Sequence, residues 1–80
     1  MKIKILFFAE LREIFGGSRF IDVREDLTVG EVVDLLEDEL NQSYSKRDSL
    51  IYAVNENFET TDKKLKNLDE LALMTPMSGG

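Results

Sequence analysis

The sequence predicts an α+β domain in which one long helix lies across a mixed β-sheet. Three observations lead to this prediction: the chain has 80 residues, several short segments alternate apolar and polar side chains, and one longer segment repeats apolar side chains every three to four residues. A chain of this length forms one small core. Hydrophobic residues make up 42% of the chain, which is enough for folding despite a net charge of −6. Alternation favours strands, and the longer repeat favours an amphipathic helix.

The first segments predict a strand, a short helix and a second strand. Residues 2–8 alternate β-branched and aromatic side chains with others, and because their second face is not fully polar, a central place in the sheet is expected. Residues 9–15 carry apolar side chains at helical spacing and stop at Gly16 and Gly17, where glycine ends helices. Residues 19–24 alternate again. The two strands are expected to pair as a hairpin.

A capping box marks the start of the long helix. Thr28 and Glu31 stand three residues apart, so each side chain is able to bond the other's backbone N–H, while Leu27 and Val32 stand where a hydrophobic staple closes. The helix therefore starts at Val29. Its apolar side chains follow helical spacing and predict a face that packs on a sheet: Val29, Val32, Val33, Leu36 and Leu40.

The second half predicts a loop and three more strands. Residues 41–49 are polar and indicate a loop, whereas residues 50–54 are apolar and favour a strand. A turn leads to a short edge strand at 58–60, and residues 70–74 form the last strand. The order β-β-α-β-β-β indicates the β-grasp, or ubiquitin-like, architecture; another α+β roll is the alternative.

Composition excludes several kinds of chemistry. The chain has no cysteine and no histidine, which excludes disulfides, thiolate nucleophiles, iron–sulfur clusters, imidazole bases and the usual zinc sites; we expect no bound metal and no bound cofactor. The net charge of −6 argues against a nucleic-acid partner. No apolar run is long enough to span a membrane, and the opening residues show no signal-peptide pattern, so a cytoplasmic location is expected.

The C-terminal residues differ from the rest of the chain. We expect a domain over residues 1–75 and a flexible tail over residues 76–80, because Pro76 cannot donate to a strand ladder and Gly79 and Gly80 carry no side chain. Such a tail is thin enough to enter a narrow channel and to place the Gly80 carboxylate in another protein's active site. The alternative is a glycine-rich end without a function.

A free carboxylate is a poor acyl donor, so this hypothesis requires activation. Adenylation with ATP converts the carboxylate into a reactive acyl group. The chain has no phosphate-binding loop of the Gly-x-x-x-x-Gly-Lys-Ser/Thr kind. A separate enzyme would therefore activate the tail, and this chain would be its substrate.

Four segments carry a resemblance that spans the whole chain: LFFAELRE (residues 6–13), AVN (53–55), DE (69–70) and PMSGG (76–80). They resemble the small, sulfur-carrier subunit of molybdopterin synthase. The chain departs from that family at Leu68, where glycine is usual, and at residues 75–77, where Pro-Pro-Val is usual.

The resemblance implies a sulfur-carrier function. The Gly80 carboxylate would be adenylated by an ATP-dependent activating enzyme, converted to a thiocarboxylate by a sulfur donor, and used to supply sulfur to cyclic pyranopterin monophosphate in the large synthase subunit. Two small and two large subunits would assemble. The large subunit would hold the catalytic groups, so this chain would be no enzyme by itself. Four residues before Gly80 would thread the channel: Pro76, Met77, Ser78 and Gly79.

Four residues are candidates for a partner interface. Phe7 has strand spacing, which favours the core over a partner surface. Arg12 and Glu13 lie in the first resembling segment and either pair across an interface or decorate an exposed helix. Met74 stands at the base of the tail, where a flexible thioether packs equally well into a partner or into the core.

Three other functions remain open at this stage. A thiamine-pathway sulfur carrier shares the terminal Gly-Gly. A ubiquitin-like protein modifier would join Gly80 to lysines of other proteins. A plain β-grasp interaction module would bind partners through its sheet and carry an incidental tail.

Overall fold

The computed structural model of the chain describes residues 1–41 and 46–76. Its elements confirm the expected order, with strand ends shifted by one or two residues. In chain order they are β1 (Lys2–Phe7), α1 (Glu10–Phe15), β2 (Ser18–Asp22), α2 (Val29–Leu40), the 3-10 turn η1 (Arg47–Ser49), β3 (Ile51–Val54), β4 (Asn57–Glu59) and β5 (Glu70–Met74).

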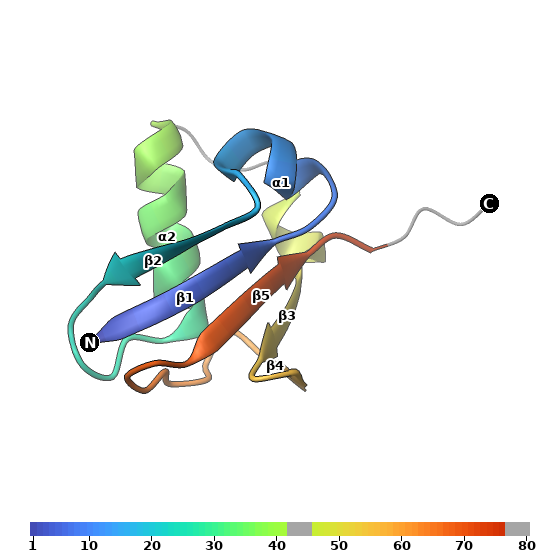
Figure 1. Cartoon of the computed structure of the whole chain (residues 1–80). Coiled ribbons are helices and arrows are strands. Elements are labelled where there is room, and N and C mark those ends of the chain that lie inside the picture. Colours follow the sequence, from blue (N-terminus) through green and yellow to red (C-terminus); the bar gives the residue numbers. More distant parts are fainter. Residues whose placement is uncertain (42–45, 77–80) are drawn as a thin grey trace.

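The five strands form one mixed sheet in the order β2-β1-β5-β3-β4, with α2 across one face (Figure 1). β1 is antiparallel to β2 and parallel to β5, and β3 is antiparallel to both β4 and β5. The expected central position of β1 and edge position of β4 are both confirmed. Because β5 lies in the middle of the sheet, the chain that follows it leaves the sheet between β1 and β3.

The core lies between α2 and the sheet face beneath it. Strand alternation sends every second side chain toward this inner face, and the helical stripe of α2 packs on it. Burying one such aliphatic side chain stabilises the fold by about 1.5–3 kcal/mol. The side chains with no exposed surface at all are Ile3, Ile5, Val29, Val32 and Leu71.

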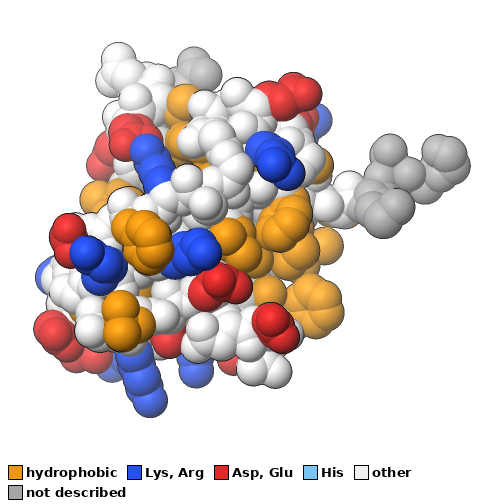
Figure 2. Space-filling view, in the orientation of Figure 1, with side chains coloured by type: hydrophobic (Ala, Val, Ile, Leu, Met, Phe, Trp, Pro, Cys, Tyr) orange, Lys and Arg blue, Asp and Glu red, His pale blue; other side chains and the backbone are white. Residues whose placement is uncertain are grey.

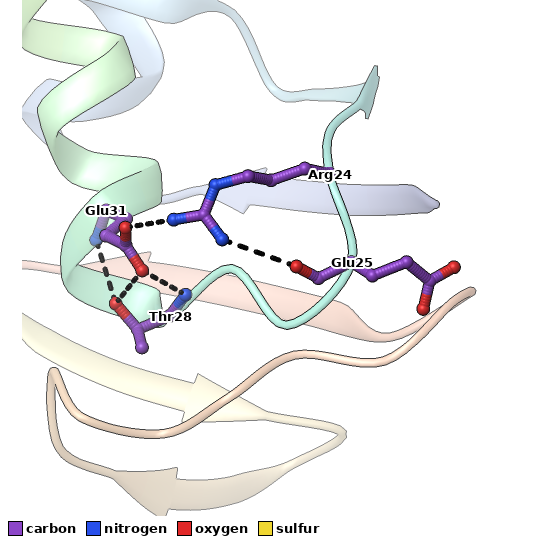
Figure 3. A network of polar contacts seen from close by, with 4 residues as sticks. All are labelled: Arg24, Glu25, Thr28 and Glu31. Atoms are coloured by element: carbon purple, nitrogen blue, oxygen red, sulfur yellow. Dashed lines mark hydrogen bonds and ion pairs between the residues drawn. The ribbon is translucent and has the colours of Figure 1, made fainter.

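The capping box fixes the start of α2, as expected (Figure 3). Thr28 Oγ1 accepts from the Glu31 backbone N–H at 3.2 Å, and Glu31 Oε1 accepts from the Thr28 N–H at 3.1 Å. Arg24 forms an ion pair with Glu31. The hydrogen bonds from Thr28, followed by the charge of Arg24, lower the pKa of the Glu31 carboxyl. The cap thus prefers an ionised Glu31.

The expected loop at residues 41–49 is wrong at its end, because Arg47–Ser49 forms the η1 turn. Arg47 anchors this turn to α2: its guanidinium donates to Asp34 Oδ1 at 2.6 Å and to the Gly30 carbonyl at 3.1 Å, and it also pairs with Glu37. Local polarity predicted a loop, but long-range ion pairs gave the segment a defined turn.

The turn before β5 brings together two of the resembling segments. Asn55 donates to Asp69 Oδ1 at 2.9 Å and accepts from the Glu70 N–H at 3.0 Å. Asp69 also accepts from the Lys66 N–H at 2.7 Å. Leu68 lies in this turn with φ of +71° and is 72% exposed. A conformation that suits glycine is therefore occupied by leucine.

Candidate functional site

The base of the tail is the last described part of the chain. β5 ends at Met74, and the chain continues through a half-buried Thr75 to an exposed Pro76. Met77, Ser78, Gly79 and Gly80 lie outside the described residues. Their roles in threading and in chemistry, and the division at residue 75, stay predictions.

Two neighbouring strands flank the end of β5. Leu73 lies beside Phe7 of β1, and its carbonyl accepts from the Phe8 N–H at 3.2 Å. On the other side, Met74 lies opposite Ile51, the first residue of β3. The β1–α1 connection and the start of β3 therefore lie at the same end of the sheet as Pro76 (Figure 1).

Phe7 is a core residue, which its strand spacing favoured, and it does not belong to a partner surface. Phe7 is 1% exposed and stacks on Phe15 with ring centroids 5.0 Å apart. It lies on the inner face because its strand alternation matches that of Ile3 and Ile5. Its neighbour Phe8 is 43% exposed instead.

Arg12 and Glu13 both lie on the exposed side of α1. The Arg12 guanidinium lies against Gly17, with its nitrogens 3.6 Å from the place where a Cβ would stand. Neither residue forms an ion pair with another residue of ranges 1–41 and 46–76. Both charges are available to a partner protein.

Met74 belongs to an apolar surface on the sheet face that α2 leaves uncovered. Neighbouring strands align its members, with Ala72 between Leu6 and Ala53, and Ala53 beside Phe58. Figure 2 shows apolar side chains gathered on this face, on the side where β5 ends. Phe58 is 78% and Ile51 37% exposed. We call this surface the outer apolar patch; it consists of Leu6, Phe8, Ile51, Ala53, Phe58, Ala72 and Met74.

Most of this patch has no signal in the local sequence pattern. Phe58 lies in the predicted edge strand, but neither its 78% exposure nor its position beside Ala53 follows from that pattern. The signal that was available is the apolar second face of β1, at Leu6 and Phe8, which indicated that the outer face is not fully polar.

The other half of the uncovered face is charged. Lys4 lies between Phe20 and Glu70 in the sheet. The Nζ atoms of Lys4 and Lys2 lie 5.8 Å and 6.0 Å from the centre of the Phe20 ring. The outer face is thus divided into a charged half at the start of β1 and the apolar patch at the end of β5.

A hollow of about 410 Å³ adjoins the base of the tail. The ion pair between Lys46 Nζ and Glu10 Oε2, at 3.1 Å, forms part of its wall. The remaining lining residues are Ala9, Ser49, Thr75 and Pro76. Ala9 has φ of +54° and lies in the two-residue connection between β1 and α1.

The described residues offer surfaces for docking. In ranges 1–41 and 46–76, no three acidic side chains come together in an arrangement suited to a metal ion. No helix of these ranges is both long and apolar enough to cross a membrane. What the arrangement provides is a central strand, β5, that ends at Met74 beside an apolar surface.

Comparisons with known proteins agree with this arrangement. The model of the ThiS family matches residues 5–80. The chain is 38% identical over 84 residues to the molybdopterin synthase sulfur carrier subunit of Drosophila sechellia, covering 100% of this chain and 92% of that protein. It is 35% identical over 88 residues to the same subunit of Anopheles gambiae, covering 100% and 93%.

Solved structures confirm the ubiquitin-like β-grasp fold. The crystal structure of SAMP1 from Haloferax volcanii matches with a TM-score of 0.78 and 27% identity, over 100% of both chains. A ubiquitin from Caldiarchaeum subterraneum matches with a TM-score of 0.65 and 20% identity, over 100% and 98%. A chain in the complex of subunits 1 and 2 of the molybdopterin-converting factor from Helicobacter pylori has a TM-score of 0.65 and 20% identity, over 100% of both.

The last two structures, at 20% identity, bear on the fold alone. Family membership follows from the family model and from the relatives, which match over the full chain. The chain therefore belongs to the ThiS family and, within it, to the sulfur carrier subunits of molybdopterin synthase.

Proposed function

We propose that this chain carries sulfur as a thiocarboxylate on Gly80 during molybdopterin synthesis. The observation that carries the proposal is the full-length similarity to sulfur carrier subunits, at 38% identity. The fold supports it, because β5 brings the chain to Pro76 at one end of the sheet, beside the outer apolar patch.

The proposed chemistry takes place at the Gly80 carboxylate. An ATP-dependent activating enzyme adenylates the carboxylate and releases pyrophosphate. A donor that delivers sulfur as hydrogen sulfide then attacks the carbonyl carbon; the C–S bond forms as the C–O bond to AMP breaks, and loss of the remaining proton leaves a thiocarboxylate. In the large synthase subunit the thiocarboxylate supplies its sulfur to cyclic pyranopterin monophosphate. The large subunit contributes the catalytic groups, and ATP is consumed only by the activating enzyme.

The outer apolar patch is the proposed docking surface for the large subunit. Exposed aromatic side chains are typical of interface hot spots, and Phe58 and Phe8 extend from this patch. Arg12 and Glu13 supply charges at the same end of the molecule. The complex of subunits 1 and 2 from Helicobacter pylori shows that a chain of this fold pairs with a second subunit. Two small and two large subunits are the proposed assembly.

Deletion of Gly79 and Gly80 tests the proposal. The truncated chain is expected to fold with an unchanged unfolding midpoint, since both residues follow the last strand. The deletion is expected to abolish molybdenum-cofactor synthesis in cells that have no other source of this chain. A matched control, Lys66→Ala, alters an exposed residue of the turn before β5 and is expected to retain synthesis. Cofactor synthesis by the truncated chain would contradict the proposal.

Protein modification is the second candidate function. It is favoured by the match to SAMP1, at 27% identity and a TM-score of 0.78; the same organism's protein is also described as small archaeal modifier protein 1. In this case Gly80 would form isopeptide bonds with lysines of other proteins. Larger conjugates that vanish when Gly80 is removed, with cofactor synthesis unaffected, would favour this function over sulfur carriage.

A further inference from the structure

The short helix α1 has little of its own to hold it in place. It has six residues, its N-cap Ala9 makes no side-chain hydrogen bond, and Leu11 is its one buried residue. Helices of this length are unstable in water when isolated. Contacts with other elements therefore decide where α1 lies, and with it the exposed side chains of Arg12 and Glu13.

Arg19 makes one such contact from the edge strand β2, where it lies opposite Ile5. Ile5 faces the core, so the Arg19 side chain lies on the inner face of the sheet. Its guanidinium carbon is 5.7 Å from the centre of the Phe15 ring and 5.9 Å from the centre of the Phe7 ring. These two rings stack on each other. Arg19 thus covers the aromatic pair through which α1 packs on β1.

Arg19 also joins β2 to α2, because its guanidinium forms an ion pair with Glu39. α1 lies beside the C-terminal end of α2 (Figure 1), where Phe15 and Leu40 line one apolar hollow. Within the described part of the chain, the buried Arg19 Nε atom has no hydrogen-bond partner. An unsatisfied buried N–H costs free energy. The contacts with the rings and with Glu39 therefore have to compensate for that cost.

We propose that Arg19 is a positioning residue that holds α1 against β1 and α2 and thereby presents Arg12 and Glu13 to a partner protein. The positive guanidinium is attracted to the negative faces of the two rings, and the ion pair anchors it on α2. Without this contact α1 opens locally while the sheet and α2 remain folded. The inference rests on the proposed function only in identifying the partner as the large synthase subunit.

Hydrogen exchange of backbone amides measures the opening of α1 in the chain alone. One probe is the Arg12 N–H, which donates to the Ala9 carbonyl at 3.1 Å, and another is the Gly16 N–H, which donates to the Arg12 carbonyl at 2.9 Å. In Arg19→Ala both amides are expected to exchange about fivefold faster, because the attraction between the guanidinium and the rings is lost.

A reference amide separates the opening of α1 from a general loss of stability, which would accelerate exchange equally everywhere. The Val29 N–H, which donates to the Lys63 carbonyl at 2.9 Å, is this reference and is expected to change by less than about twofold. Arg24→Ala is the matched control, because Arg24 also forms an ion pair with α2, at Glu31. It is expected to leave exchange in α1 unchanged.

The conservative variant Arg19→Lys keeps the positive charge and is expected to restore part of the protection of α1. Unchanged exchange in α1 of Arg19→Ala, or equal acceleration in α1 and at Val29, would overturn the inference.

Binding to the large subunit tests the presentation of Arg12 and Glu13. Arg19→Ala is expected to weaken this binding by about fivefold. In a chain in which Arg12 and Glu13 are already replaced by alanine, the same substitution is expected to make no further difference, because it acts through them. An equal loss in that chain would show that Arg19 acts on the partner by another route, and it would overturn the positioning role.

The exchange experiment needs no partner, so its outcome is separate from that of the proposed function. If Arg19→Ala accelerates exchange in α1 alone while Gly80 is never thiocarboxylated, the proposed function fails and the positioning of α1 stands. If Gly80 is thiocarboxylated but exchange in α1 is unchanged, the positioning role fails alone.

Discussion

The two faces of the sheet show how differently this chain uses its apolar residues. On the inner face, Ile3, Ile5 and Leu71 lie under α2 with no exposed surface. On the outer face, Phe58 and Phe8 remain 78% and 43% exposed. Burial explains the first set, because each side chain stabilises the fold. Burial does not explain the second set, because exposed apolar side chains stabilise the fold little as long as water surrounds them.

This difference separates residues that maintain the fold from residues available for binding. Exposed apolar side chains are common singly, but a contiguous exposed apolar group is typical of an interaction site. Met74, a member of the outer apolar patch, is the last residue of β5. The proposed docking surface therefore lies on the sheet face opposite the core.

The strongest test of the comparison replaces one phenylalanine on each face. Phe7→Ala is expected to cost about 3–5 kcal/mol of unfolding free energy, because it empties a site that is 1% exposed. Phe58→Ala is expected to stay within about 0.5 kcal/mol of the original chain. Urea unfolding measures both. Similar losses in the two variants would break the separation of the faces.

For binding to the large subunit, substitutions on the outer face are expected to matter, although they change the stability little. Phe58→Ala and Ile51→Ala remove exposed apolar side chains from the outer patch and are each expected to weaken binding to the large subunit by about 1–2 kcal/mol. Calorimetric titration of the purified subunits provides the measurement. Lys64→Ala, at an exposed site outside the patch, is the control. Full affinity in both patch variants would mean that the large subunit docks elsewhere.

A substitution in the turn before β5 tests the effect of backbone strain, separately from that of burial. Leu68 has φ of +71° and is 72% exposed, so its side chain contributes little packing. Leu68→Gly is expected to stabilise the fold by up to about 1 kcal/mol, since glycine adopts this conformation without a Cβ clash. The midpoint of urea unfolding should rise. A clear fall would show that Leu68 makes contacts that outweigh the strain.

The smallest expected effect concerns the helix cap and depends on pH. Hydrogen bonds from Thr28 lower the pKa of Glu31 from its usual 4.5. A carboxyl with a lowered pKa stabilises the fold above its unfolded pKa, and this stabilisation is lost as pH falls through the folded value. Glu31→Gln, which keeps the shape, should therefore be less stable at neutral pH and lose this disadvantage in acid. A difference that does not vary with pH would show that the charge of Glu31 is irrelevant.

Sequence patterns predicted the elements that depend on local rules. The capping box placed the start of α2 correctly at Val29, because its hydrogen bonds join residues three apart. The strands followed from alternation. The η1 turn was missed, since its anchor joins Arg47 to Asp34 thirteen residues earlier.

The candidate site was less predictable, because exposure depends on what covers each face. Alternation alone separates Phe7 from Phe8 but leaves open which of them meets α2. The same limit applies to Phe58, whose neighbour Ala53 comes from another strand. The sequence signals the positive φ of Leu68 only indirectly, because the resembling family usually has glycine at this position.

The central claim is tested most directly by the intact mass of the untagged protein, isolated from its own cells and fragmented to localise any change. The account predicts a mass increase equal to replacing one oxygen by sulfur, confined to Gly80. An unmodified Gly80, in cells that are actively making molybdenum cofactor, would contradict it. Branched peptides joined through Gly80 would instead support protein modification.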